Sequence, residues 1–159
     1  MLRLSKLTDY AVVVLIRLAE LAPAESCAVQ TSPGIAAATG VPEPTVAKVL
    51  KALSAADLVL SQRGARGGYR LNRTLHNISV ADVITAIDGP IALTACVDGA
   101  TGSCEVQGLC AVKGRWDLVN EAIQASLSGI SLAQMRAASV PFAFRVPDPL
   151  PALSTFPAE

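Results

Sequence analysis

The 159-residue sequence has few aromatic residues, a single histidine and no long uninterrupted hydrophobic segment. Aromatic residues make up 4% of the chain, whereas 52% of it is hydrophobic, and this mixture predicts a mostly helical, soluble protein. The apolar stretch of residues 11–21 is interrupted by Arg17 and Glu20, so it resembles neither a secretory signal nor a membrane span. We therefore expect a cytoplasmic protein with no membrane partner, in which cysteine thiols stay reduced.

The scarcity of histidine also limits the chemistry that the chain can perform. It contains no Ser, His and Asp set of the kind used in nucleophilic catalysis, and no P-loop. The single histidine, His76, stands in a position that favours a solvated surface role. We therefore expect no enzymatic activity.

Net charge is zero, but the charges are unevenly distributed along the chain. Residues 1–75 hold nine Lys and Arg against five Asp and Glu, whereas residues 76–159 hold four against eight. A basic half joined to an acidic half suggests that the first half binds a polyanion.

Hydrophobic periodicity and capping signals predict a winged helix-turn-helix over residues 1–75. Residues 7–21 have helical spacing, residues 31–40 form a short helix that ends at Gly40, and residues 41–60 form a second amphipathic helix entered through prolines. Residues 58–72 are strand-like, then glycine-rich, then strand-like again, which is typical of a β-wing. The expected fold class is mainly α with a small β-wing.

The second helix of such a motif places its N-terminal end in the DNA major groove. Here Glu43 can accept a hydrogen bond from a cytosine amino group, and Thr45 can contact a base edge or a thymine methyl group. The full set of predicted DNA contacts is Glu43, Thr45, Lys48, Lys51, Arg63, Arg66 and Arg70. The two lysines are assigned to phosphates, and a wing arginine to the minor groove. The alternative is a winged helix used only for protein contacts, with its arginines on an ordinary solvated face.

The second half divides into three predicted parts. Residues 76–112 contain a short helix at 79–88, capped by Ser79, and then a cysteine loop. Residues 113–139 form a long dimerisation helix, because apolar residues recur near heptad spacing at 116, 119, 123, 127 and 130. Residues 140–159 are rich in proline and have no periodicity, which predicts a disordered tail.

Three of the four cysteines lie within the fifteen residues CVDGATGSCEVQGLC, at Cys96, Cys104 and Cys110. Their spacing contains no C-x-x-C unit of the kind that most zinc sites use. A flexible loop that supplies three thiolates fits an iron–sulfur cluster better, with zinc binding and thiol redox chemistry as the alternatives. Cys27 stands apart, and we expect it to be a buried thiol.

These motifs, taken in order, resemble the Rrf2 (Rrf-two) family of bacterial winged-helix regulators. The resemblance covers about residues 1–135 and rests on the cysteine loop together with MLRLSKLTDYAVVVLIRLAE, TGVPEPTVAKVLKALSAADLV, RGARGGYRL and ISVADVITAIDGP. It implies an IscR-like homodimeric repressor, closest to the branch that regulates the SUF iron–sulfur assembly system. It also implies a near-palindromic double-stranded DNA operator and an iron–sulfur cluster held by Cys96, Cys104 and Cys110. The genes it implies are those of cluster assembly, iron or redox stress.

The sequence departs from the IscR pattern at the fourth cluster ligand. IscR-like members have a histidine three residues after the last cysteine, where this chain has Lys113. An ammonium group is a poor ligand, so the fourth position needs another donor. The candidates are Asp98 and Glu105 in the loop, Asp9 of the partner subunit, or a small molecule. Asp9 has the competing interpretation of a helix N-cap, and both [2Fe–2S] and [4Fe–4S] clusters remain open.

Overall fold

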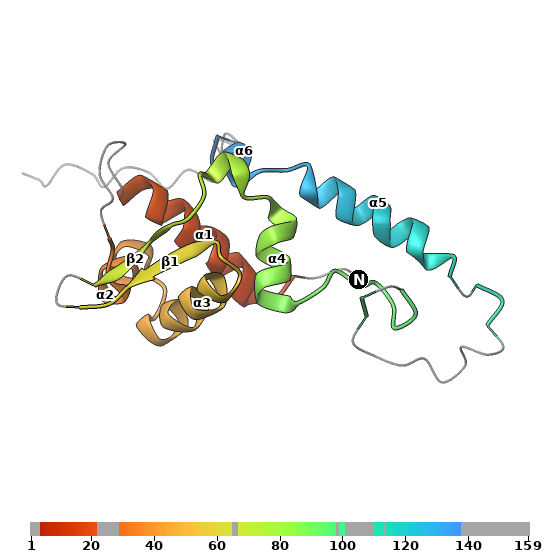
Figure 1. Ribbon diagram of the computed structural model, residues 1–159, viewed down its shortest axis with the longest axis horizontal. Helices are drawn as coiled ribbons and strands as arrows, with labels where there is room; N and C mark the ends of the chain where they lie inside the picture. Colours follow the sequence, from red (N-terminus) through yellow and green to blue (C-terminus); the bar gives the residue numbers. More distant parts are fainter. Residues whose placement is uncertain are drawn as a thin grey trace, which may run out of the picture.

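The computed structural model describes residues 4–21, 29–64, 67–97, 99–100, 110–112 and 114–137. These residues form a mainly helical fold with one two-stranded antiparallel sheet (Figure 1), which confirms the expected fold class. Within the described residues, no helix has the length and apolar character needed to cross a membrane. The predicted tail, residues 140–159, lies outside the described part of the chain.

The helices and strands follow one another as helix-turn-helix, hairpin and a second group of helices. In chain order they are α1 (Lys6–Leu21), α2 (Ser32–Thr39), α3 (Glu43–Ala55), β1 (Val59–Gln62), β2 (Gly68–Leu71), the short 3-10 helix η1 (Leu75–Asn77), α4 (Val80–Asp88), α5 (Trp116–Ser128) and α6 (Leu132–Ala137).

The turn between α2 and α3 is set by local capping. Thr31 lies just before α2, and its side chain accepts a hydrogen bond from the Gly34 amide at 3.2 Å. Gly40 ends α2 with a φ of 71°, a left-handed conformation that favours glycine. Pro42 then leads into α3, which begins at Glu43. Gly40 at the end of α2 and the prolines at the entry to α3 therefore predicted this turn correctly.

The hydrophobic core lies where α1, α3 and α4 pack on one another. The largest fully buried side chains include Leu15 and Leu18 of α1 and Leu50 and Leu53 of α3. Residues beyond position 75 complete the same core, and these are Ile78, Val80, Val83, Ile84, Leu132 and Ala133. The winged helix and the second group of helices therefore share one core.

The wing is a short hairpin whose second strand is held on both sides. β1 and β2 pair with Ser61 opposite Tyr69 and Leu60 opposite Arg70. On the other side of β2, Gln30 and Tyr69 exchange two backbone hydrogen bonds of 2.8 Å. A Cβ atom on Gly68 would lie 2.6 Å from the Gln30 carbonyl oxygen, so this close approach requires glycine.

The predicted helix over residues 113–139 is two helices, because the chain turns back to the core at Ser131. Ser131 caps α6, accepting from the Gln134 amide at 3.2 Å, while the Gln134 side chain accepts from the Ser131 amide at 2.8 Å. The amide of Leu132, which is fully buried, donates to the Ile78 carbonyl at 2.9 Å. As a result α6 rejoins the core, whereas α5 projects away from the wing (Figure 1).

Candidate DNA interface and cysteine loop

The solvent face of α3 carries the residues that we predicted to contact DNA. The core face of this helix is formed by Val46, Val49, Leu50 and Leu53. On the other side Glu43, Lys48 and Lys51 are exposed, and Thr45 is half-buried. A helix packed on the core through one face and exposed through the other can enter a DNA groove without unfolding.

The wing arginines occupy different places. Arg63 is exposed directly after β1, and Arg70 is half-buried in β2. Because Arg70 is paired with Leu60, it lies on the opposite hairpin face from Ser61 and Tyr69. Arg66 lies outside the described residues. Contact with DNA stays a prediction for each of these arginines.

The positive charge of this surface is not neutralised by ion pairs within the described part of the chain. Arg17 and Glu20 form an ion pair of 2.9 Å on α1. By contrast, Lys48, Lys51 and Arg63 have no carboxylate partner among the described residues. Their charges are therefore available to a polyanion.

The described part of the cysteine loop contains two of the three predicted cluster ligands. Cys96 and Cys110 are half-buried thiols that form no disulfide, and the Cys96 sulfur lies 3.2 Å from Thr94 Oγ1. The other residues named in the cysteine and ligand predictions lie outside the described part of the chain: Cys27, Asp98, Cys104, Glu105 and Lys113. Among the described residues, no three His, Cys, Asp or Glu side chains gather closely enough to hold a metal ion. Two reduced, partly shielded thiols at the ends of the loop fit the donor chemistry of a metal or cluster site.

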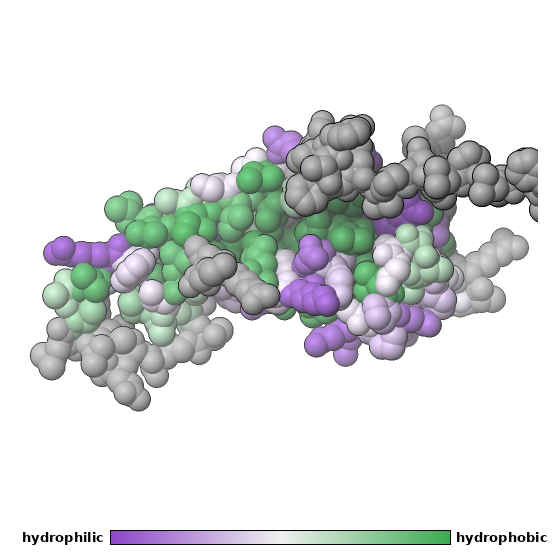
Figure 2. All heavy atoms as spheres, turned by 180° about the vertical axis from the view of Figure 1, so that it is seen from behind, coloured by the Kyte–Doolittle hydropathy of each residue, from purple (hydrophilic) through white to green (hydrophobic). Residues whose placement is uncertain are grey.

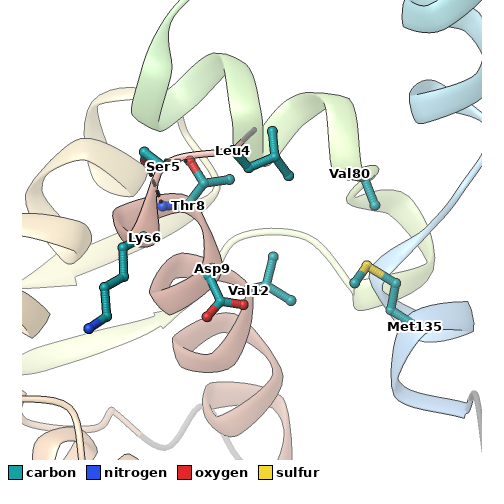
Figure 3. A pocket seen from close by; sticks show the side chains of 8 residues that line it. All are labelled: Leu4, Ser5, Lys6, Thr8, Asp9, Val12, Val80 and Met135. Carbon is teal, nitrogen blue, oxygen red and sulfur yellow. Dashed lines mark hydrogen bonds between the residues drawn. The ribbon is translucent and has the colours of Figure 1, made fainter. Parts of the chain in front are cut away.

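The structure contradicts the interpretation of Asp9 as a helix N-cap. The cap of α1 is Ser5, whose hydroxyl accepts from the Thr8 amide at 3.2 Å, and Asp9 follows in the first turn. Asp9 lines a pocket of about 370 Å³ where α1 meets α4 and α6, and Met135 lies across from it (Figure 3). Neither Cys96 nor Cys110 lines this pocket. A ligand role for Asp9 of the partner subunit stays a prediction.

Asn120 is a structural residue that our sequence analysis missed. Its side chain is 6% exposed, although it projects from the outlying helix α5. Its Nδ2 donates to the Ile91 carbonyl at 2.9 Å, and its Oδ1 accepts from the Leu93 amide at 3.1 Å. These two bonds fasten the segment just before Cys96 to α5. The sequence feature that could have identified this residue is an asparagine on the helical face that carries the apolar residues of the predicted dimerisation helix.

A second pair of hydrogen bonds joins the start of α1 to the end of α4. Thr8 Oγ1 donates to Asp88 Oδ2 at 2.6 Å, and the Ser5 amide donates to the same oxygen at 3.4 Å. Burial raises the pKa of the Asp88 carboxyl, but hydrogen bonds from Thr8 and Ser5 outweigh it and hold the pKa below its ordinary value. α1 is therefore tied to the point where the chain leaves α4 toward the cysteine loop.

A helix-turn-helix with an exposed basic helix, followed by a β-hairpin, defines a winged-helix DNA-binding protein. The family model of Rrf2, described as an iron-dependent transcriptional regulator, matches residues 4–138. The chain therefore belongs to the Rrf2 family.

Two relatives illustrate this similarity in sequence. A protein of Mycobacterium tuberculosis designated as an HTH-type transcriptional regulator, Rv1287, is 33% identical over 141 residues, 88% of this chain and 84% of its own length. The HTH-type transcriptional regulator IscR of Vibrio parahaemolyticus is 34% identical over 83 residues, 52% of this chain and 48% of its own. Both names describe transcriptional regulators and not enzymes.

Two solved structures are similar to the fold. CymR, the global cysteine regulator of B. subtilis, superposes with a TM-score of 0.63 at 26% identity, covering 86% of this chain and 98% of CymR. IscR of T. potens gives a TM-score of 0.57 at 25% identity, covering 91% of this chain and 97% of that protein. The fold of this chain is thus shared with regulators over nearly its whole length.

Proposed function

We propose that this protein is a cytoplasmic homodimeric repressor whose affinity for its operator depends on an iron–sulfur cluster. The observation that carries the proposal is a loop with reduced Cys96 and Cys110, placed between a winged helix and α5 and fastened to α5 by Asn120. The iron-dependent description of the family and the similarity to IscR support it. Its target genes would serve iron–sulfur assembly, iron supply or redox stress.

The proposed ligands are the thiolates of Cys96, Cys104 and Cys110, with a fourth donor still to be identified. When bound, such a cluster is the group that oxygen, nitric oxide or iron shortage would remove or alter. The protein's own part is to supply soft donors and to shield them. Half-burial of Cys96 and Cys110 provides some of that shielding.

The hydrogen bonds of Asn120 and those of Asp88 offer a path by which a change in the loop can reach the DNA-binding surface. Ordering of the loop would restrict residues 91–93, which Asn120 holds against α5. The end of α4 is bonded to α1 through Asp88, and α1 packs directly on α3. A change of about 10- to 100-fold in DNA affinity corresponds to a coupling of about 1.4–2.7 kcal/mol. One or two hydrogen bonds of about 1 kcal/mol each are of the required size.

The proposed dimer interface is the exposed apolar side of α5. Trp116 and Val119, which share one side of this helix, are 40% and 42% exposed. Figure 2 shows hydrophobic side chains gathered in a band along this side of the molecule. A second copy would cover this band and set two α3 helices about one DNA turn, roughly 34 Å, apart on a near-palindromic site.

Anaerobic purification followed by absorption spectroscopy and iron, sulfide and zinc analysis tests this function. Brown protein with iron and sulfide in near-stoichiometric amounts is expected, and Cys104→Ala should lose the colour. Holo and apo protein should then differ in affinity for an operator selected from random DNA. Colourless protein that holds zinc, or that changes only by reversible disulfide formation, would replace the cluster by zinc or thiol sensing.

A further inference from the structure

An open cleft of about 400 Å³ lies between α3 and the wing. Its lining consists of Ala47, Lys51, Ser54 and Ala55 of α3, Ser61 of β1 and Tyr69 of β2. The α3 residues share one helical face because they are spaced by four, seven and eight positions. Ser61 and Tyr69 are directly paired across the hairpin and so share one of its faces. None of these six lining residues carries a carboxylate.

The polar groups of this cleft are hydrogen-bond donors without partners in the described part of the chain. Lys51 offers three N–H donors, and Ser54, Ser61 and Tyr69 each offer a hydroxyl. No side-chain hydrogen bond or ion pair occupies any of the four among the described residues. One positive charge with three hydroxyls and no negative charge suits an anion that only accepts hydrogen bonds.

The wall formed by Tyr69 is rigid. Both backbone polar groups of this residue are bonded to Gln30, and the neighbouring Gly68 packs tightly against the same residue. The Tyr69 side chain is half-buried and packs against the hydrophobic core. A tyrosine anchored in this way has an apolar body in the core and a polar tip for solvent or ligand.

The DNA-binding geometry of a winged helix identifies the anion. With α3 in the major groove and the wing at the adjacent minor groove, the one sugar–phosphate strand that separates these grooves must cross between them. We infer that the cleft seats a phosphate of this strand, with Lys51, Ser54, Ser61 and Tyr69 as donors. The inference rests on the DNA-binding part of the proposed function, and it assigns DNA contact to three hydroxyl residues outside the predicted set.

The test measures binding of the full anaerobically purified chain to a labelled random-sequence duplex across a range of salt concentrations. Lys51→Gln should reduce the slope of log affinity against log salt by about 0.9 for each lysine that contacts a phosphate. Ser61→Ala and Tyr69→Phe should each weaken binding about tenfold and leave the slope unchanged, because they remove a hydrogen bond and no charge. The loss should be equal for specific and random duplexes.

Matched controls come from the other side of the molecule. Arg136→Gln removes an exposed charge on α6, and Ser128→Ala removes an exposed hydroxyl at the end of α5; neither should change slope or affinity. Salt-dependent binding by the wild type with unchanged Ser61→Ala and Tyr69→Phe variants would overturn the inference and leave DNA binding intact. An effect of Lys51→Gln alone would place the phosphate outside the cleft and also overturn it. A wild type that binds no duplex would overturn the proposed function and this inference together.

Discussion

Removal of the Asn120 side chain should loosen the entry to the cysteine loop without unfolding the DNA-binding half. Asn120→Ala deletes two hydrogen bonds, to the Ile91 carbonyl and the Leu93 amide. At about 1 kcal/mol each, their loss should lower the free energy of local opening by about 2 kcal/mol. Because 1.4 kcal/mol is a factor of ten, the Leu93 amide should then exchange with solvent roughly 30-fold faster.

Amide hydrogen exchange resolved by residue is the assay for this loosening. Gln124→Ala is the matched control, because Gln124 is an exposed amide side chain on the same helix, one turn further along. Amides in α3, such as that of Leu53, should exchange at wild-type rates in both variants. Unchanged exchange at Leu93 would refute the role of Asn120, and an equal increase at Leu53 would show global destabilisation instead. In protein that holds the proposed cluster, Asn120→Ala should also accelerate cluster loss.

Three further predictions concern stability. Asp88 has a pKa held below its ordinary value of 3.8, so the stabilisation it provides is present above that value and is lost as pH falls through the folded-state pKa. The Tm difference between wild type and Thr8→Val should therefore shrink from neutral pH to about pH 3, and a constant difference would contradict this. Gly68→Ala should cost about 1–3 kcal/mol in urea unfolding because of the clash with Gln30, whereas wild-type stability would show that the wing adjusts freely. Leu53→Ala should cost about 2–5 kcal/mol in the same measurement, since Leu53 is fully buried; a loss under 1 kcal/mol would place it outside the core.

Local signals predicted the winged helix well because each of its elements is decided within a few residues. Thr31 and Gly40 fix both ends of α2, and close backbone contacts require glycine at Gly67 and Gly68 of the wing. The break between α5 and α6 escaped prediction because apolar residues continue at helical spacing across it. A capping box that begins at Ser131 competes with that periodicity and prevails.

The candidate sites were predicted unevenly for a similar reason. The exposed residues of α3 follow from the helical period, and the cysteines of the loop stand out by their spacing. Asn120 and the bond between Thr8 and Asp88 join segments far apart in the chain, so periodicity could not identify their partners. The cap of α1 was misassigned because Ser5, Thr8 and Asp9 are all residue types that favour caps, and the helix starts directly after the first of them.

The bonds between Asn120 and residues 91–93 have a consequence for how such a protein can diversify. They hold the start of the cysteine loop against α5, the helix that follows the loop. The two ends of the intervening chain are therefore close together in space. Doubling the length of a loop closed in this way costs only about 0.6 kcal/mol of additional closure entropy. Insertions, deletions or exchanged ligands in that segment therefore leave the winged helix almost undisturbed. Evolution can thus fit a new chemical sensor to an unchanged DNA-binding fold.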